Sequence, residues 1–214
     1  MPSTIFKKNL STKELAEAIY EFAVATYKHN IKEFTSFPIL NDLDENKKIL
    51  CINEFFFFCF SAVRLITQHY VKKYHPDKYS AVYMKFNDIF YNERKRFSTE
   101  KSARRMIRRL YLRNKSYDLY YQLHNKKFSR IPILFEILIL ESIASPARGE
   151  PTSTKLLTGF LDCKDISVLS NQQTKDFEKM FDEQKMTRFL EKIISFIVRL
   201  SEKQLSELQM IKKI

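Results

Sequence analysis

Apolar residues recur along this chain at intervals of three and four positions, which is the spacing of a helix packed on one side. Leu15, Ile19 and Phe22 show it first, and they follow Ser11 and Glu14. A serine and a glutamate three residues apart can form a capping box, in which each side chain binds the other residue's backbone N–H at the start of a helix. The pattern therefore predicts an all-α, bundle-like protein of six or seven helices in a single domain, 1–214. The expected helices occupy 12–35, 45–74, 78–96, 99–124, 133–143 and 172–212, with a short one near 153–162.

Three of these segments have distinctive patterns. The segment 45–74 is apolar nearly all round, so it is expected to run through the core. The segment 172–212 is amphipathic along its length, and its last turns are expected to project far enough to bind a protein partner or a second copy of the chain. The run at 133–143 also fits a buried strand, but we favour a helix because no partner strand is evident.

Glycine and proline limit the turns that this chain can make. Only two glycines occur, Gly149 and Gly159. Tight turns that need a positive φ must then be scarce, which argues against hairpin-rich β architectures and predicts less than about 5% strand. Gly149 lies with two prolines in 145–153, which predicts a long loop or hinge before the C-terminal helical segment.

The apolar runs and the cysteines indicate where the chain resides. The most apolar stretch, 55–63, is nine residues long, well short of the roughly 20 that cross a bilayer. Residues 1–10 lack the apolar run of a signal peptide. The three cysteines form no C-x-x-C pair and are expected to be buried, reduced thiols. We therefore expect no transmembrane segment and a cytoplasmic location.

Positive charge is concentrated in one part of the chain. The formal net charge is +12, and the segment 93–130 holds thirteen Lys or Arg against three acidic residues, a local net charge of +10. Such a concentration predicts a basic patch for an anionic partner. Ser98 is expected to cap the helix 99–124, which contains most of these cations.

The helix 99–124 is predicted to have a basic side and an apolar side. At 100° per residue, one half of its surface is basic, and the planar guanidinium of arginine suits bidentate contacts with phosphate. The alternative is a solvated surface whose cations pair with acids such as Glu17, Glu21 or Glu183 on neighbouring helices. The residues predicted to bind nucleic acid or another polyanion are Lys101, Arg104, Arg105, Arg108, Arg109 and Arg113.

Residues 74–78 read Tyr-His-Pro-Asp-Lys. This segment resembles the loop of J-domain co-chaperones, in which His-Pro-Asp joins two antiparallel helices and engages an Hsp70 partner. The resemblance implies a co-chaperone function for His75, Pro76 and Asp77. The alternative is local, because Pro76 ends one helix and Asp77 can cap the next.

Arg64 and His69 have an R-x4-H spacing. This spacing resembles the catalytic pair of HEPN ribonucleases, all-helical proteins in which an arginine and a histidine, usually from two subunits, cleave RNA. The resemblance implies that His69 acts as general acid or base while Arg64 steadies the phosphate. The alternative is that Glu54, Arg64, Gln68 and His69 form a polar edge on a core helix, with their hydrogen bonds satisfied inside the protein.

No other catalytic pattern stands out. The chain has no phosphate-binding loop and no metal-ligand spacing, so we expect neither a cofactor nor a metal. The function expected first is that of a non-enzymatic binding or adaptor protein that presents the helix 99–124 to nucleic acid without strong sequence specificity. A HEPN-like ribonuclease, a J-domain-like co-chaperone and a purely structural or protein-interaction module are the alternatives.

Overall fold

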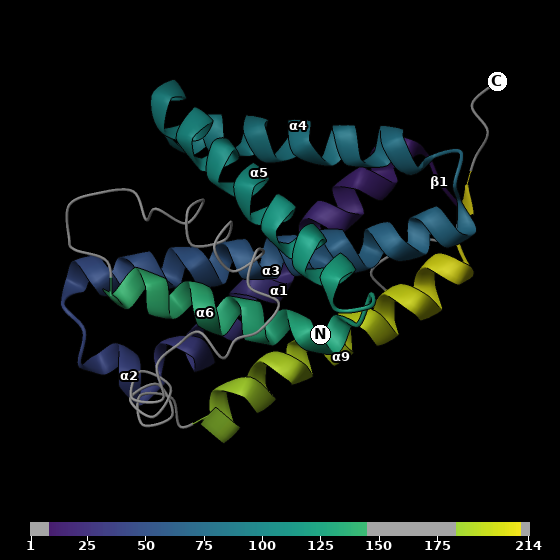
Figure 1. The fold of residues 1–214 in the computed structure, drawn as a ribbon. Helices are drawn as coiled ribbons and strands as arrows, with labels where there is room; N and C mark the ends of the chain where they lie inside the picture. Colours follow the sequence, from purple (N-terminus) through teal and green to yellow (C-terminus); the bar gives the residue numbers. More distant parts are fainter. Residues whose placement is uncertain (1–8, 145–182, 211–214) are drawn as a thin grey trace.

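The structure, a computed structural model, describes residues 9–144 and 183–210. These residues are 87% helical, which confirms the all-α prediction. The predicted loop at 145–153, the short helix near 153–162 and the first residues of 172–212 lie outside the described part of the chain. The elements in Figure 1 are β1 (Asn9–Leu10), α1 (Thr12–Thr35), α2 (Pro38–Asn41), α3 (Glu45–Tyr74), α4 (Tyr79–Phe97), α5 (Glu100–Leu123), the 3-10 turn η1 (Phe128–Arg130), α6 (Ile131–Ala144), α9 (Glu183–Ser206) and β2 (Gln209–Met210).

Helix α3 lies at the centre of the molecule, in contact with α1, α5, α6 and α9 (Figure 1). Seventeen of its thirty residues are buried. Phe55 stacks on Phe34 of α1 with ring centroids 4.2 Å apart, and Phe58 lies 4.7 Å from Phe135 of α6. Aromatic rings bury large apolar areas, so these contacts explain why the sequence of α3 is apolar nearly all round.

The length and composition of α3 also match those of a membrane-spanning helix. Of the helices in the described ranges, α3 alone passes this test, with a mean hydropathy of 1.9 over its most apolar 18 residues. However, 78% of that window is buried inside the protein. This burial is typical of a core helix, so the window is weak evidence for a membrane span.

The starts of two helices test the capping predictions. Ser11 and Glu14 form the predicted capping box at α1, with the Ser11 N–H donating to Glu14 Oε2 at 2.8 Å and the Glu14 N–H donating to Ser11 Oγ at 3.3 Å. The predicted N-cap of α5 is wrong. Thr99, and not Ser98, accepts the backbone N–H of Ser102 at 3.3 Å, while the Ser98 hydroxyl donates to a carbonyl in the last turn of α4.

The C-terminal helix α9 ends at Ser206, before the end predicted at 212. Leu205 and Leu208 are buried, and β2 then pairs with β1 as a parallel strand. The last turns of α9 therefore pack within the molecule, and the expectation that they project is wrong. The segment predicted at 133–143 is a helix, α6, as favoured.

Helices α4 and α5 form a hairpin joined through Ser98 and Thr99. α4 packs on α1 and α5, and α5 also contacts α3 and α6. Figure 1 shows the joined ends of α4 and α5 at the upper left, away from α3. Phe97 at this end is 84% exposed. The hairpin thus places the first turns of α5 at the surface.

Candidate nucleic-acid interface

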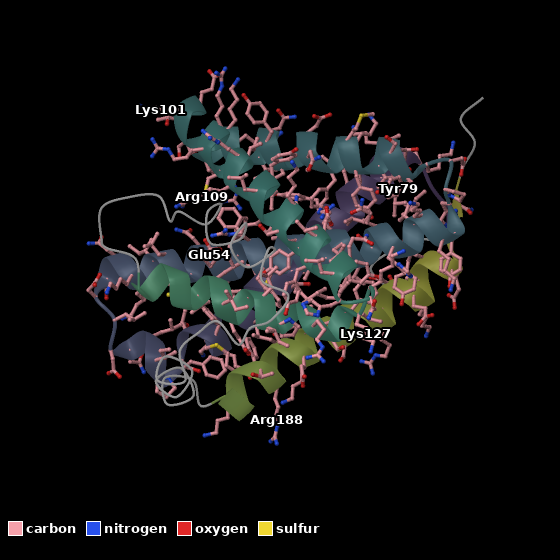
Figure 2. The ribbon with its side chains drawn as sticks, in the orientation of Figure 1. Glu54, Tyr79, Lys101, Arg109, Lys127 and Arg188 are labelled. Carbon is pink, nitrogen blue, oxygen red and sulfur yellow. The ribbon has the colours of Figure 1, made fainter. Side chains whose placement is uncertain are left out.

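Helix α5 carries the cations that the sequence predicts as a binding surface. It begins at the N-cap Thr99, and Glu100 in its first turn suits the positive end of the helix. The buried residues Ala103, Leu110 and Tyr117 recur every seven positions and fix the side that faces the protein. Figure 2 shows Lys101 at the outer end of α5. We define the basic face as the five cations on the other side of this helix, of which only Arg109 is half-buried: Lys101, Arg104, Arg105, Arg108 and Arg109.

Most cations of the basic face have no acidic partner in the described part of the chain. Arg104 pairs with Glu100 at 2.5 Å, and this hydrogen bond raises the pKa of the Arg104 guanidinium. The other four make no ion pair with a described residue. Glu17, proposed as a partner in the alternative interpretation, lies 3.7 Å from Lys13 instead. Exposed pairs such as Arg104–Glu100 contribute only about 0–1 kcal/mol, so even this cation can exchange its partner.

Arg113 does not belong to the basic face, and its prediction as an exposed ligand is wrong. Its side chain is 6% exposed, and it donates two hydrogen bonds of 2.7 Å to the carboxylate of Glu54, which is 5% exposed. The bidentate geometry neutralises both charges in the core, as a buried ion pair requires. One signal in the sequence points to this partner, since Glu54 interrupts the apolar part of 45–74 and a buried glutamate needs a cation.

The end of α4 adds positive charge next to the basic face. Lys95 and Arg96 are exposed, and Arg96 lies 2.5 Å from Glu93. Arg94 is half-buried with its guanidinium 4.4 Å from the centroid of the Phe56 ring. These cations of α4 and those of α5 meet at the joined ends of the hairpin. The positive surface therefore extends over two helices, as the basic segment 93–130 does, although the residues predicted to bind all lie on one.

A cleft of about 270 Å³ opens between α3, α4 and α5 beside the basic face. Its outer part is formed by Tyr111, which is 58% exposed, and by Lys115, whose Nζ lies 5.6 Å from the centroid of that ring. The Tyr83 hydroxyl donates to Thr67 Oγ1 at 2.9 Å, and burial raises the pKa of Tyr83. The cleft is lined by Arg64, Tyr83, Asn87, Phe90, Ile107, Leu110, Tyr111, Asn114, Lys115 and Asp118.

Arg64 lies at the inner side of this cleft. It donates to Gln68 Oε1 at 2.5 Å, to the Asn114 carbonyl at 3.3 Å and to the carboxylate of Asp118. Among the seven buried side-chain atoms that have no hydrogen-bond partner in the described part of the chain, two belong to residues that line this cleft, namely Arg64 Nε and Asn114 Oδ1. Buried polar groups are normally paired, so both atoms need an explanation. The polar edge predicted on the core helix therefore exists at Glu54, Arg64 and Gln68, but its hydrogen bonds are not all satisfied.

His69, the other residue of the R-x4-H pattern, has different neighbours. Its ring meets those of Tyr70 and Phe128 edge-on, and its Nδ1 lies 3.4 Å from the Tyr121 hydroxyl. Partial burial lowers the pKa of His69, helped by Lys73 and opposed by Glu202. Arg64 lines the cleft whereas His69 does not. Within one copy of the chain the structure does not bring the two side chains to a common site.

The comparisons with known proteins add no relative. No protein family, curated protein or solved structure matched this chain. Among residues 9–144 and 183–210, no group of three or more His, Cys, Asp or Glu side chains could hold a metal ion.

The His-Pro-Asp segment joins α3 and α4, as the two-helix resemblance requires. His75 is the C-cap of α3, and its Nε2 lies 3.1 Å from the Leu205 carbonyl in the last turn of α9. Asp77 does not cap α4, because the N-cap is Lys78 and no side chain provides the bond. The predicted capping function of Asp77 is wrong. His75 instead ties the loop to the end of α9, which satisfies a carbonyl that a helix leaves without an internal partner.

Proposed function

We propose that this protein binds nucleic acid through the basic face of α5, as a non-enzymatic binding or adaptor module without strong sequence preference. The observation that carries the proposal is that four of the five cations, Lys101, Arg105, Arg108 and Arg109, make no ion pair within the described chain. Protein surfaces usually intersperse acidic and basic side chains. A surface whose only role is solubility would therefore be expected to place acidic residues beside some of these cations.

The dimensions of the basic face fit a phosphate backbone. Lys101 and Arg109 are eight residues apart, which spans about 12 Å at 1.5 Å per residue. Duplex DNA carries one charge per about 1.7 Å of axis, so several phosphates lie within this span. Lys95 and Arg96 on α4 widen the positive surface at its outer end. The contacts involve side chains of a regular helix and phosphate groups, so they carry no information about base sequence.

The expected binding is electrostatic and depends on salt. If three to five cations each neutralise one phosphate, log K falls with log salt at a slope of roughly −3 to −4.5 for duplex DNA, using about 0.9 per contact. Fluorescence anisotropy with a labelled 20-base-pair duplex, titrated at several salt concentrations, measures this slope. A slope near zero, or the absence of binding at low salt, would refute the proposal.

A charge-reversal experiment locates the interface on α5. Arg105→Glu with Arg108→Glu replaces two exposed cations, and the double variant is expected to lose binding while keeping the wild-type melting temperature. The matched control is Arg188→Glu with Arg199→Glu, which reverses two exposed arginines of α9. Figure 2 places Arg188 at the bottom of the molecule, opposite Lys101. Equal losses in the two variants would show that overall charge, and not the basic face, determines the affinity.

A further inference from the structure

The cleft between α3, α4 and α5 adjoins the basic face along one line of α5. Arg104, Arg108, Tyr111 and Lys115 are spaced four, three and four residues apart, so they form a row on the helix surface. The first two belong to the basic face, and the last two line the cleft. A strand of phosphates that follows Arg104 and Arg108 therefore arrives at the mouth of the cleft.

The size and the polar groups of the cleft define what it can hold. Its volume of 270 Å³ is near the lower end of small-molecule sites, about 300 Å³, which suits one heterocyclic ring system. Arg64 and Asn114 are 7% and 9% exposed, and each has one polar atom without a partner among the described residues, a donor at Arg64 Nε and an acceptor at Asn114 Oδ1. The two residues are neighbours, because another nitrogen of Arg64 donates to the Asn114 carbonyl at 3.3 Å.

We propose that this cleft receives one unpaired base of a single-stranded nucleic acid whose backbone lies on the basic face. The proposal rests on the nucleic-acid binding proposed above. Arg64 Nε and Asn114 Oδ1 each expose less than 1 Å² to solvent, so a base reaches them only when these two side chains shift. The donors and acceptors on the edge of a base then complement the acceptor of Asn114 and the donor of Arg64. Tyr111, exposed at the mouth, offers a ring on which the base stacks, and every base has a face suited to stacking.

Single strands should therefore bind more tightly than duplexes of equal length and salt. In a duplex the bases are already stacked and paired, so entry into the cleft would require one base to be flipped out at a cost. The discrimination among the four bases is expected to be small, since stacking contributes most of the affinity and one donor with one acceptor fits several base edges.

The experiment uses the full-length protein and three labelled probes: a twelve-nucleotide oligo-dT, the same backbone without bases, and a twelve-base-pair duplex. Anisotropy titrations at one salt concentration compare the wild type with Tyr111→Leu, with Asn114→Leu and with the matched control Tyr111→Phe, which keeps the ring. We expect the wild type to bind oligo-dT about 5- to 10-fold more tightly than the abasic strand, the lower part of the range for stacking one base. Tyr111→Leu and Asn114→Leu should remove this preference, whereas Tyr111→Phe should keep it.

The possible results distinguish binding of a base in the cleft from electrostatic binding on the basic face. Equal wild-type affinity for oligo-dT and the abasic strand would overturn the base site and leave electrostatic binding intact. A preference that survives both leucine substitutions would equally overturn it. If no probe binds, the proposed function itself fails. Tyr111 is exposed, so Tyr111→Leu should fold even if Asn114→Leu does not. Thermal melting shows whether each variant is folded.

Discussion

The buried pair of Glu54 and Arg113 predicts which arginine of α5 the fold depends on. Both side chains are almost completely buried and are joined by two hydrogen bonds of 2.7 Å. Arg113→Met keeps a long side chain but leaves the Glu54 carboxylate buried without its cation. Breaking a buried pair in this way costs about 3–5 kcal/mol of unfolding free energy. For a chain of 150–250 residues this corresponds to a fall in melting temperature of roughly 6–20 °C.

A double-mutant cycle separates the pair from the volume of its side chains. Glu54→Leu with Arg113→Met removes both charges together, and the double variant is expected to be close to the wild type in stability or above it, since apolar replacements of buried pairs are often neutral or stabilising. Arg105→Met is the matched control on the exposed side of α5 and should change the unfolding free energy by less than about 0.5 kcal/mol. Urea unfolding followed by circular dichroism measures all five proteins: the wild type, Glu54→Leu, Arg113→Met, the double variant and Arg105→Met. If Arg113→Met alone costs less than 1 kcal/mol, or the double variant is no more stable than either single one, the reasoning is refuted.

Three further predictions concern the thiols, the His-Pro-Asp loop and RNA cleavage. Burial raises the pKa of Cys51 to about 12 and that of Cys59 well above its ordinary value of 9.0, so these two thiols should not react with a thiol reagent in native protein at pH 8. These thiols ionise in the unfolded chain above pH 9 and not in the folded one, so stability should fall between about pH 9 and 12 in urea titrations; an increase would contradict this. His75→Ala should lower the unfolding free energy by about 0.5–1.5 kcal/mol, because the bond to the Leu205 carbonyl is lost; stimulation of an Hsp70 ATPase by wild type but not by this variant would instead support the co-chaperone alternative. Purified wild type should leave mixed RNA intact; cleavage that disappears in Arg64→Ala with His69→Ala would establish the HEPN-like alternative.

The periodic part of the fold could be predicted from the sequence because helical amphipathicity is local. The bounds predicted for the first two long helices agree with α1 and α3, and the bounds for α4 and α5 differ by one residue at each end. Four-residue α2 is too short to show a period. The end of α9 was misjudged for a different reason. Its apolar spacing continues to Leu208, but the chain leaves the helix at Ser206 so that β2 can pair with β1, some 200 residues away in sequence.

The candidate site was harder to predict because burial on α5 depends on contacts distant in sequence. Arg109 and Arg113 are one turn apart on α5, yet only Arg113 faces α3 closely enough to meet Glu54, 59 residues earlier. The cleft could not be predicted at all. Arg64 and Asn114 belong to different helices, and the periodicity of a sequence does not reveal the angle at which two helices pack. The R-x4-H spacing instead predicted that Arg64 acts together with His69.

Arg113 and the basic face should therefore respond differently to salt, although they lie on one helix. At an ionic strength of 0.1 M the Debye length is about 10 Å, so salt screens the attraction between exposed cations such as Arg105 and Arg108 and an anionic ligand. The Glu54–Arg113 pair excludes solvent ions and is screened much less. Raising salt should weaken nucleic-acid binding along the slope given above while the contribution of the buried pair to stability stays nearly constant. The pair also holds α5 on α3 before any ligand arrives. The backbone that carries the basic face is thus ordered in advance, so binding costs conformational entropy mainly in its exposed side chains.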